Sequence, residues 1–262
     1  YRNMKNLYIV SFLFLCLQTN AQKPALIYDD NAQLRQVGNF KAIKVSSGID
    51  LYLTQSDDCQ VAVSASNNQI RDRIQTSMEG ETLVIKFDNS NGWSWSSWGN
   101  YKMKAYVSIK ELNALTGSGA SRIRLLSTIT TPKLQVKLLG ATDLSGDIET
   151  HVFSLNLSGA SDYKGKLNAT SFVFNGSGAS SCEISGTADD LSLDLSGASI
   201  AKFYELYAKG AIVNVSGAST ANIRVSELLK GDISGASIIN YKGDAIVKEM
   251  KTSGSSSIRY RN

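Results

Sequence analysis

Two aspartates that occupy the same position in neighbouring repeats could support acid chemistry. Asp143 and Asp162 each lie three residues after a repeated glycine. If the repeats stack as strands, the two carboxylates lie about 4.8 Å apart, where such a pair could bind a cation or work as acid and base. The next repeat has Ser181 at this position, so a third ligand is missing. We therefore expect a solvated, outward-facing pair, a weak cation or glycan site, and no metal or cofactor.

A second candidate is the aromatic loop over residues 89–101, which departs from the repeat pattern. It contains all three tryptophans of the protein, spaced by serine and glycine, and ends in a tyrosine: Trp93, Trp95, Trp98 and Tyr101. Exposed aromatic rings among small polar residues are typical of a glycan platform or a protein-binding hot spot. The loop could equally be a hairpin tip whose indoles cover the first end of the repeats. Both interpretations stay open, and the loop is the best candidate for contact with a partner.

The single histidine, His151, does not indicate an enzyme. A serine-histidine-aspartate triad needs one histidine, but no Gly-x-Ser-x-Gly motif of this chain lies between a strand and a helix. His151 begins a strand and is predicted to face outward. We predict a protein that is not an enzyme.

These residues are positioned by a short sequence motif that recurs eight times, Gly-Ala-Ser or a close variant. It begins at Gly119, Gly140, Gly159, Gly178, Gly197, Gly217, Gly235 and Gly254. The spacings are 21, 19, 19, 19, 20, 18 and 19 residues. A near-constant period of this length is the signature of a solenoid in which each repeat forms one rung.

Each rung is predicted to be β-structure on both sides of a Gly-Ala-Ser corner. Apolar residues alternate with polar ones before each glycine, as in Phe153, Leu155 and Leu157, and again after each serine. Glycine permits a positive φ at the corner, and alanine is expected to point into the crowded corner. The serines on either side of Gly-Ala should form two columns of stacked hydroxyls. Cys182 falls on an inward position and is predicted to be buried.

The start of the chain predicts export. After a leader over residues 1–3, residues 4–21 combine Lys5, an apolar stretch of about eleven residues and a small-residue cleavage site before Gln22. This is typical of a signal peptide and is too short for a membrane helix. Removing residues 1–21 leaves 25 basic and 23 acidic residues from the 27 and 23 of the whole chain, a net charge of +2. That balance argues against a nucleic-acid partner, and no further segment is long enough to span a membrane.

The remaining chain is predicted to have three parts. Residues 22–38 form an N-terminal linker, and residues 39–116 form irregular β rungs that cap the first end and carry the aromatic loop. Residues 117–262 form the regular solenoid.

The sequence also resembles a known family. The resemblance is carried by Gly48-Ile49-Asp50, by a Gly-Glu-x-Leu-Val-Ile strand at residues 80–85, and by Leu-Thr-Gly-Ser-Gly-Ala-Ser at residues 115–121. These resemble the putative auto-transporter adhesin, head GIN domain family (DUF2807) of Bacteroidetes-type bacteria, over about residues 39–245. The resemblance implies a right-handed parallel β-helix at the cell surface or in the periplasm, and it brings no catalytic residues.

We therefore predict an all-β, exported, non-catalytic solenoid that acts as an adhesin-like or cell-envelope binding scaffold. Its partner is expected to be a glycan or a cell-surface protein, and its location the periplasm, the outer-membrane surface or the extracellular space. One alternative is a polysaccharide-active enzyme that uses Asp143 and Asp162. Another is a structural envelope module that self-associates end to end.

Overall fold

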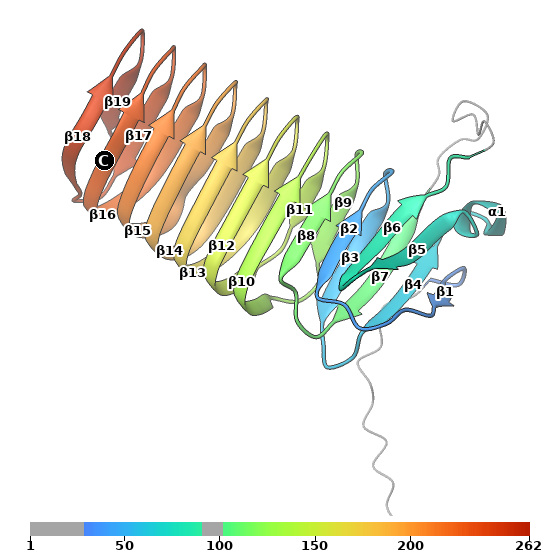
Figure 1. The fold of residues 1–262 in the computed structure, drawn as a ribbon. Coiled ribbons are helices and arrows are strands. Elements are labelled where there is room, and N and C mark those ends of the chain that lie inside the picture. Colours follow the sequence, from blue (N-terminus) through green and yellow to red (C-terminus); the bar gives the residue numbers. More distant parts are fainter. Residues whose placement is uncertain (1–28, 91–101) are drawn as a thin grey trace, which may run out of the picture.

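The computed structural model describes residues 29–90 and 102–262, and the described chain is almost entirely β-structure. Rungs stack side by side along one axis, from the first complete rung to the C-terminal end (Figure 1). There are about eight turns with rungs about 19 residues apart, so the predicted β-solenoid is confirmed. Within the described residues, no helix has the length and apolar character that crossing a membrane requires.

Where the structure describes it, the N-terminal part contains seven strands and one short helix. These are β1 (Gln33–Arg35), β2 (Ala42–Val45), β3 (Asp50–Gln55), β4 (Gln60–Ser64), α1 (Asn68–Arg71), β5 (Ile74–Glu79), β6 (Thr82–Phe87) and β7 (Lys104–Ile109).

The regular part contains twelve strands, of which those in the middle continue around a whole rung. These are β8 (Ala114–Gly117), β9 (Arg122–Leu125), β10 (Ile129–Leu138), β11 (Asp143–Ser145), β12 (Ile148–Leu157), β13 (Asp162–Gly176), β14 (Ser181–Leu195), β15 (Ile200–Val215), β16 (Thr220–Ile233), β17 (Ile238–Lys242), β18 (Ile246–Thr252) and β19 (Ser257–Tyr260).

Parallel pairing joins one rung to the next, in unbroken register from β10 to β14 and with local shifts in later rungs. Strand β12 pairs with β13 from Ile148↔Leu167 to Leu157↔Gly176, and β13 pairs with β14 from Asp162↔Ser181 onward. The N-terminal strands β2 and β3 join this stack through parallel pairing with β8 and β9.

The first end of the stack is closed by antiparallel pairs of strands. Strand β4 pairs antiparallel with β7, β1 pairs antiparallel with β4, and β5 pairs antiparallel with β6. Helix α1 is a single turn whose N-cap, Asn67, accepts a hydrogen bond from the Ile70 N–H at 2.9 Å. These elements cover strand edges and core that an open solenoid end would expose to water.

Charged hydrogen bonds fasten the start of the described chain to this cap. The Asp29 carboxylate accepts from the Lys104 ammonium at 2.8 Å, from the Tyr106 hydroxyl at 3.2 Å and from the Ser64 hydroxyl. Partial burial acts to raise the pKa of Asp29, but the hydrogen bonds from Lys104 and Ser64 outweigh it and hold that pKa below its ordinary value.

The core is one continuous column of apolar side chains that runs the length of the stack from Phe40 to Ile239. Aromatic rings stack from rung to rung inside it. Phe153 and Phe172 lie 5.3 Å apart between ring centroids with nearly parallel planes, and Phe203 packs 5.7 Å from Phe172. Cys182 is fully buried in this column, as predicted, and burial raises the pKa of its thiol well above the ordinary value.

The prediction that the corner alanine points inward is wrong. At the first seven corners the alanine is exposed, and the serine or threonine after it is buried. The inward hydroxyl donates to a carbonyl three residues earlier, as from Ser161 to Ser158 at 2.9 Å and from Ser199 to Ser196 at 2.9 Å. A buried polar group must find a partner, and a hydroxyl closes its own corner in this way whereas an alanine could not.

The repeat predicts columns in which each hydroxyl bonds to the hydroxyl of the next rung, and the structure shows this only in part. Ser180 and Ser199 approach to 3.1 Å between their hydroxyl oxygens, as a ladder requires. Elsewhere the inward hydroxyls donate to carbonyl oxygens, as Thr142 does to Leu139 at 2.8 Å and Ser219 does to Gly197 at 3.3 Å.

The corner glycine is required both by its own conformation and by the rung below. At Gly197, φ is +72° and an added Cβ would lie 2.5 Å from the carbonyl oxygen of Gly178. That same oxygen accepts the hydrogen bond from the Ala198 N–H at 2.7 Å. A side chain at this position would force the two rungs apart where they are joined.

Replacing Gly197 by alanine should therefore destabilise the fold by at least about 2 kcal/mol, from the strained φ and the clash with backbone. The measurement is the urea unfolding midpoint. The matched control is Gly210→Ala in the same rung, where φ is not positive and the nearest atom to an added Cβ is Asp190 Oδ1 at 3.6 Å. The control should change stability by no more than about 1 kcal/mol. Equal effects of the two substitutions would contradict this account of the corner.

Candidate functional site

Among the described residues, those that sequence patterns single out do not form one site. The aromatic loop residues Trp93, Trp95, Trp98 and Tyr101 lie outside the described residues. Asp143 and Asp162 lie on the lateral surface of the stack, and His151 faces outward on another part of the rung.

Asp143 and Asp162 are direct neighbours in the ladder, as their equivalent positions predict. Arg122 occupies this column before Asp143, and Ser181 follows Asp162. Partial shielding from water raises the pKa of Asp162, and the negative charge of Asp143 raises it further. Among residues 29–90 and 102–262, no group of three or more acidic, histidine or cysteine side chains could hold a metal ion.

The like-charge contact predicts a pKa change that can be measured. Asp143→Asn should lower the pKa of Asp162, because the neighbouring charge that disfavours its ionised form is gone. The pKa of Asp162 in the folded protein lies above its ordinary value, so the free energy of unfolding falls as the pH rises through that pKa. Asp143→Asn should reduce this fall in stability. Carboxyl carbon NMR titration gives the pKa directly. Asp194→Asn, in another column, is the control, and an unchanged Asp162 pKa in the Asp143 variant would show that the two charges do not interact.

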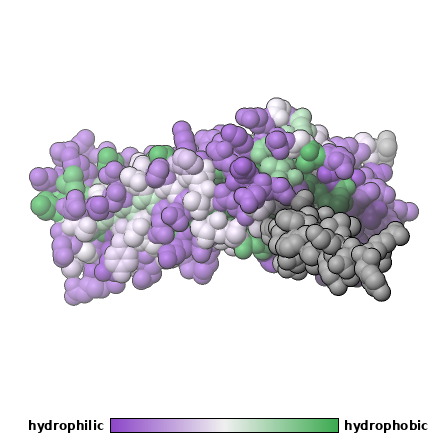
Figure 2. All heavy atoms as spheres, turned by 90° about the horizontal axis from the view of Figure 1, so that it is seen from below, coloured by the Kyte–Doolittle hydropathy of each residue, from purple (hydrophilic) through white to green (hydrophobic). Residues whose placement is uncertain are grey.

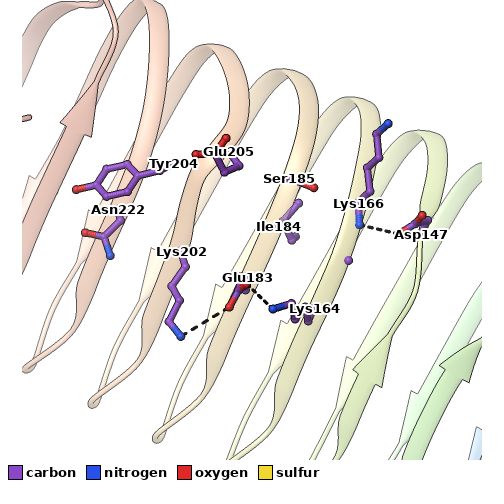
Figure 3. A pocket seen from close by; sticks show the side chains of 11 residues that line it. Asp147, Lys164, Lys166, Glu183, Ile184, Ser185, Lys202, Tyr204, Glu205 and Asn222 are labelled. Atoms are coloured by element: carbon purple, nitrogen blue, oxygen red, sulfur yellow. Dashed lines mark hydrogen bonds and ion pairs between the residues drawn. The ribbon is translucent and has the colours of Figure 1, made fainter. Parts of the chain in front are cut away.

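A hollow of about 600 Å³, here called the charged groove, lies beside this column on the lateral surface. Its lining residues come from successive rungs, mostly from β13, β14 and β15 (Figure 3). Lysines and acids alternate along the stack. The Lys164 ammonium lies 2.7 Å from one oxygen of Glu183, and the Lys202 ammonium lies 3.9 Å from the other. The hydrogen bond and charge of Lys164 lower the pKa of Glu183.

The charged groove coincides with a change in the length of the rung. The register between β14 and β15 shifts by one residue here: Glu183 pairs with Lys202, but Gly186, three residues later, pairs with Leu206, four residues after Lys202. The extra residue places Tyr204 and Glu205 at one end of the hollow (Figure 3). The exposed ion pairs in this hollow contribute little to stability, since water screens such pairs.

Two further hollows lie along a different face of the stack. One, of about 530 Å³, is lined by residues from Thr130 to Asp189, and the other, of about 480 Å³, by residues from Thr187 to Asp244. They share the lining residues Thr187 and Asp189 and are therefore adjacent; together they are here called the axial groove. His151 lies in the wall of this groove. The sequence predicts that the histidine faces outward, but it does not predict a groove at that position.

The outer surface is mostly hydrophilic on the face that Figure 2 shows, with hydrophobic residues in small groups. In the described part of the chain, His151 makes no hydrogen bond or ion pair to a serine, cysteine or carboxylate. Cys59 and Cys182 are both free. The described lateral faces therefore offer rows of polar side chains rather than an assembled nucleophile and base.

The stack of parallel rungs with glycine corners defines a repeat protein of the β-solenoid class. A family model matches residues 39–245, most of the chain, and the chain belongs to the family described as "Putative auto-transporter adhesin, head GIN domain". The resemblance seen in the sequence is thereby confirmed. No curated protein matches the sequence.

Solved structures of bacterial proteins share the fold. A protein from Parabacteroides merdae described as a putative adhesin is 18% identical, with a TM-score of 0.78 over 88% of this chain and 95% of its own. A putative adhesin from Parabacteroides distasonis is 20% identical, with a TM-score of 0.80 over 88% and 96%. Another protein of that species, described as a putative lipid binding protein, is 21% identical, with a TM-score of 0.76 over 89% and 98%.

Proposed function

We propose that this chain is an exported, non-catalytic, adhesin-like scaffold whose solenoid presents rows of side chains to a glycan or protein of a cell surface. The observation that carries the proposal is the parallel register of the rungs, unbroken from β10 to β14, which fixes outward side chains in columns along the stack. Family membership supports the adhesin-like role. The signal-peptide pattern over residues 4–21 supports export to the periplasm, the outer-membrane surface or the medium.

Rigidity is what the architecture contributes to binding. Each outward side chain stands on a strand that is paired on both sides and anchored by buried neighbours, so little ordering entropy is lost when a partner binds. A repeating row also allows many weak contacts to act together along one partner. This suits adhesion, which needs extended contact, better than it suits catalysis, which needs a few groups converging on one atom.

The proposal is tested by retention of the purified exported chain on immobilised preparations of bacterial outer membrane, peptidoglycan and mucin-type glycans. Trp95→Ala should reduce retention on the preparation that binds, because an indole that contacts a partner contributes a large contact area. Tyr260→Ala, an exposed aromatic substitution in the last strand, is the control and should leave retention unchanged. Failure of the unaltered chain to bind any preparation would contradict the proposal.

The same preparations test the absence of catalysis. No reducing ends should accumulate from a polysaccharide during prolonged incubation with the chain. Accumulation that Asp143→Asn abolishes would instead establish a polysaccharide-cleaving enzyme.

A further inference from the structure

The axial groove repeats the same three positions in the six rungs that it crosses between Thr130 and Ser226. Each rung contributes a wall residue, a middle residue and a second wall residue, as in Glu149, Thr150 and His151. The middle residues are buried or half-buried and mostly small: Thr131, Thr150, Ala169, Ala188, Ala208 and Val225. The first wall is a registered column of Thr130, Glu149, Asn168, Thr187, Tyr207 and Arg224. This wall is about 24 Å long, since neighbouring strands lie about 4.8 Å apart.

Hydroxyl and amide groups dominate the part of the groove between Thr130 and Thr187. Thr187 donates to the Asn168 side-chain oxygen at 3.3 Å, and Thr170 stands in the opposite wall. Such groups both donate and accept, and here they recur at the spacing of the rungs. A ligand that itself repeats hydroxyl groups along an extended chain can match such a row.

The groove also presents one aromatic ring, held in place from one side. Tyr207 is 51% exposed, and the Arg224 guanidinium carbon lies 4.1 Å above the centroid of its ring. Arg224 also donates to the Tyr207 hydroxyl at 3.1 Å. The neighbour of Tyr207 on the other side of the column is Thr187, a much smaller residue. One face of the ring is thus covered by a cation, while the side toward Thr187 adjoins the hydroxyl-lined part of the groove.

The charges of the groove nearly cancel. Lys209 lies 2.7 Å from Asp189, and this hydrogen bond raises the pKa of the lysine. Glu149 and Asp244 are opposed by Arg224, which leaves about one negative charge over the whole groove. Such a surface has no strong attraction for either a polyanion or a polycation.

We propose that the axial groove binds an extended, uncharged carbohydrate chain, with Tyr207 as the stacking platform and the threonine and asparagine side chains as hydrogen-bonding partners. The inference rests on the proposed function, since it names the partner class of an adhesin-like scaffold. A peptide is disfavoured because the strands that form the groove are paired on both sides, which leaves no strand edge for a peptide to extend. The aromatic ring and the hydroxyl rows are instead the groups that a sugar ring and its hydroxyls contact.

The test is isothermal titration of the full exported chain with soluble oligosaccharides of cellulose, chitin and amylose, and with an oligogalacturonate as the anionic comparison. At least one neutral oligosaccharide should bind, and the anionic one should bind more weakly. Tyr207→Ala should weaken the neutral ligand about tenfold, the loss of one aromatic platform. Thr187→Arg should weaken it as much with the tyrosine still present, because the new guanidinium would cover the ring from the side of the groove.

Tyr260→Ala is the matched control, since Tyr260 is 54% exposed but lies outside the groove. Circular dichroism of each variant shows whether the fold is kept. Binding of a neutral oligosaccharide that Tyr207→Ala and Thr187→Arg leave unchanged would overturn the groove assignment. Failure of every neutral oligosaccharide to bind would overturn it as well. In either case the proposed function stands if the unaltered chain is still retained on the surface preparations, and falls only if that retention is also absent.

Discussion

The hydrogen bond between successive corners is the contact on which the rest of the molecule depends. At each regular corner an alanine N–H donates to the carbonyl oxygen of the glycine one rung earlier, as from Ala179 to Gly159 at 2.8 Å and from Ala236 to Gly217 at 2.7 Å. The geometry leaves no room for a Cβ on the glycine, which would lie about 2.5 Å from the same oxygen. Strand register, the alignment of the core and the straightness of the outer columns all follow from corners that stack directly.

Inside this frame, packing tolerates considerable variety. Equivalent inward positions carry Leu144, Tyr163, Cys182 and Ala201 in four successive rungs, and all are buried. Two large residues are followed by two small ones along this column, so no single rung repeats another, and the core fills through other positions. Phenylalanines fill the space beside the small residues, as Phe203 does two residues after Ala201.

The outward positions need not fit into the packed core, and they carry the differences between rungs. The column of Lys164, Glu183 and Lys202 forms an ionic row, whereas the column of Asn156 and Asn175 forms an amide row with a hydrogen bond of 2.9 Å. The chain can therefore change what its surface recognises without changing how it folds. A scaffold of this kind separates the residues that build the stack from those that contact a partner.

The sequence by itself determined the period, the alternation of buried and exposed residues and the pairing of Asp143 with Asp162, because one rung must stack on the next at a fixed interval. It could not determine which small corner residue faces inward, since alanine and serine fit a tight bend equally well until the hydroxyl is seen to close the corner. Nor could it bring Tyr207 against Arg224. The two are seventeen residues apart rather than nineteen or twenty, and they meet because the register shifts between β15 and β16. The grooves likewise exist only where columns from several rungs stand side by side, which depends on backbone geometry in three dimensions rather than on any residue within a single repeat.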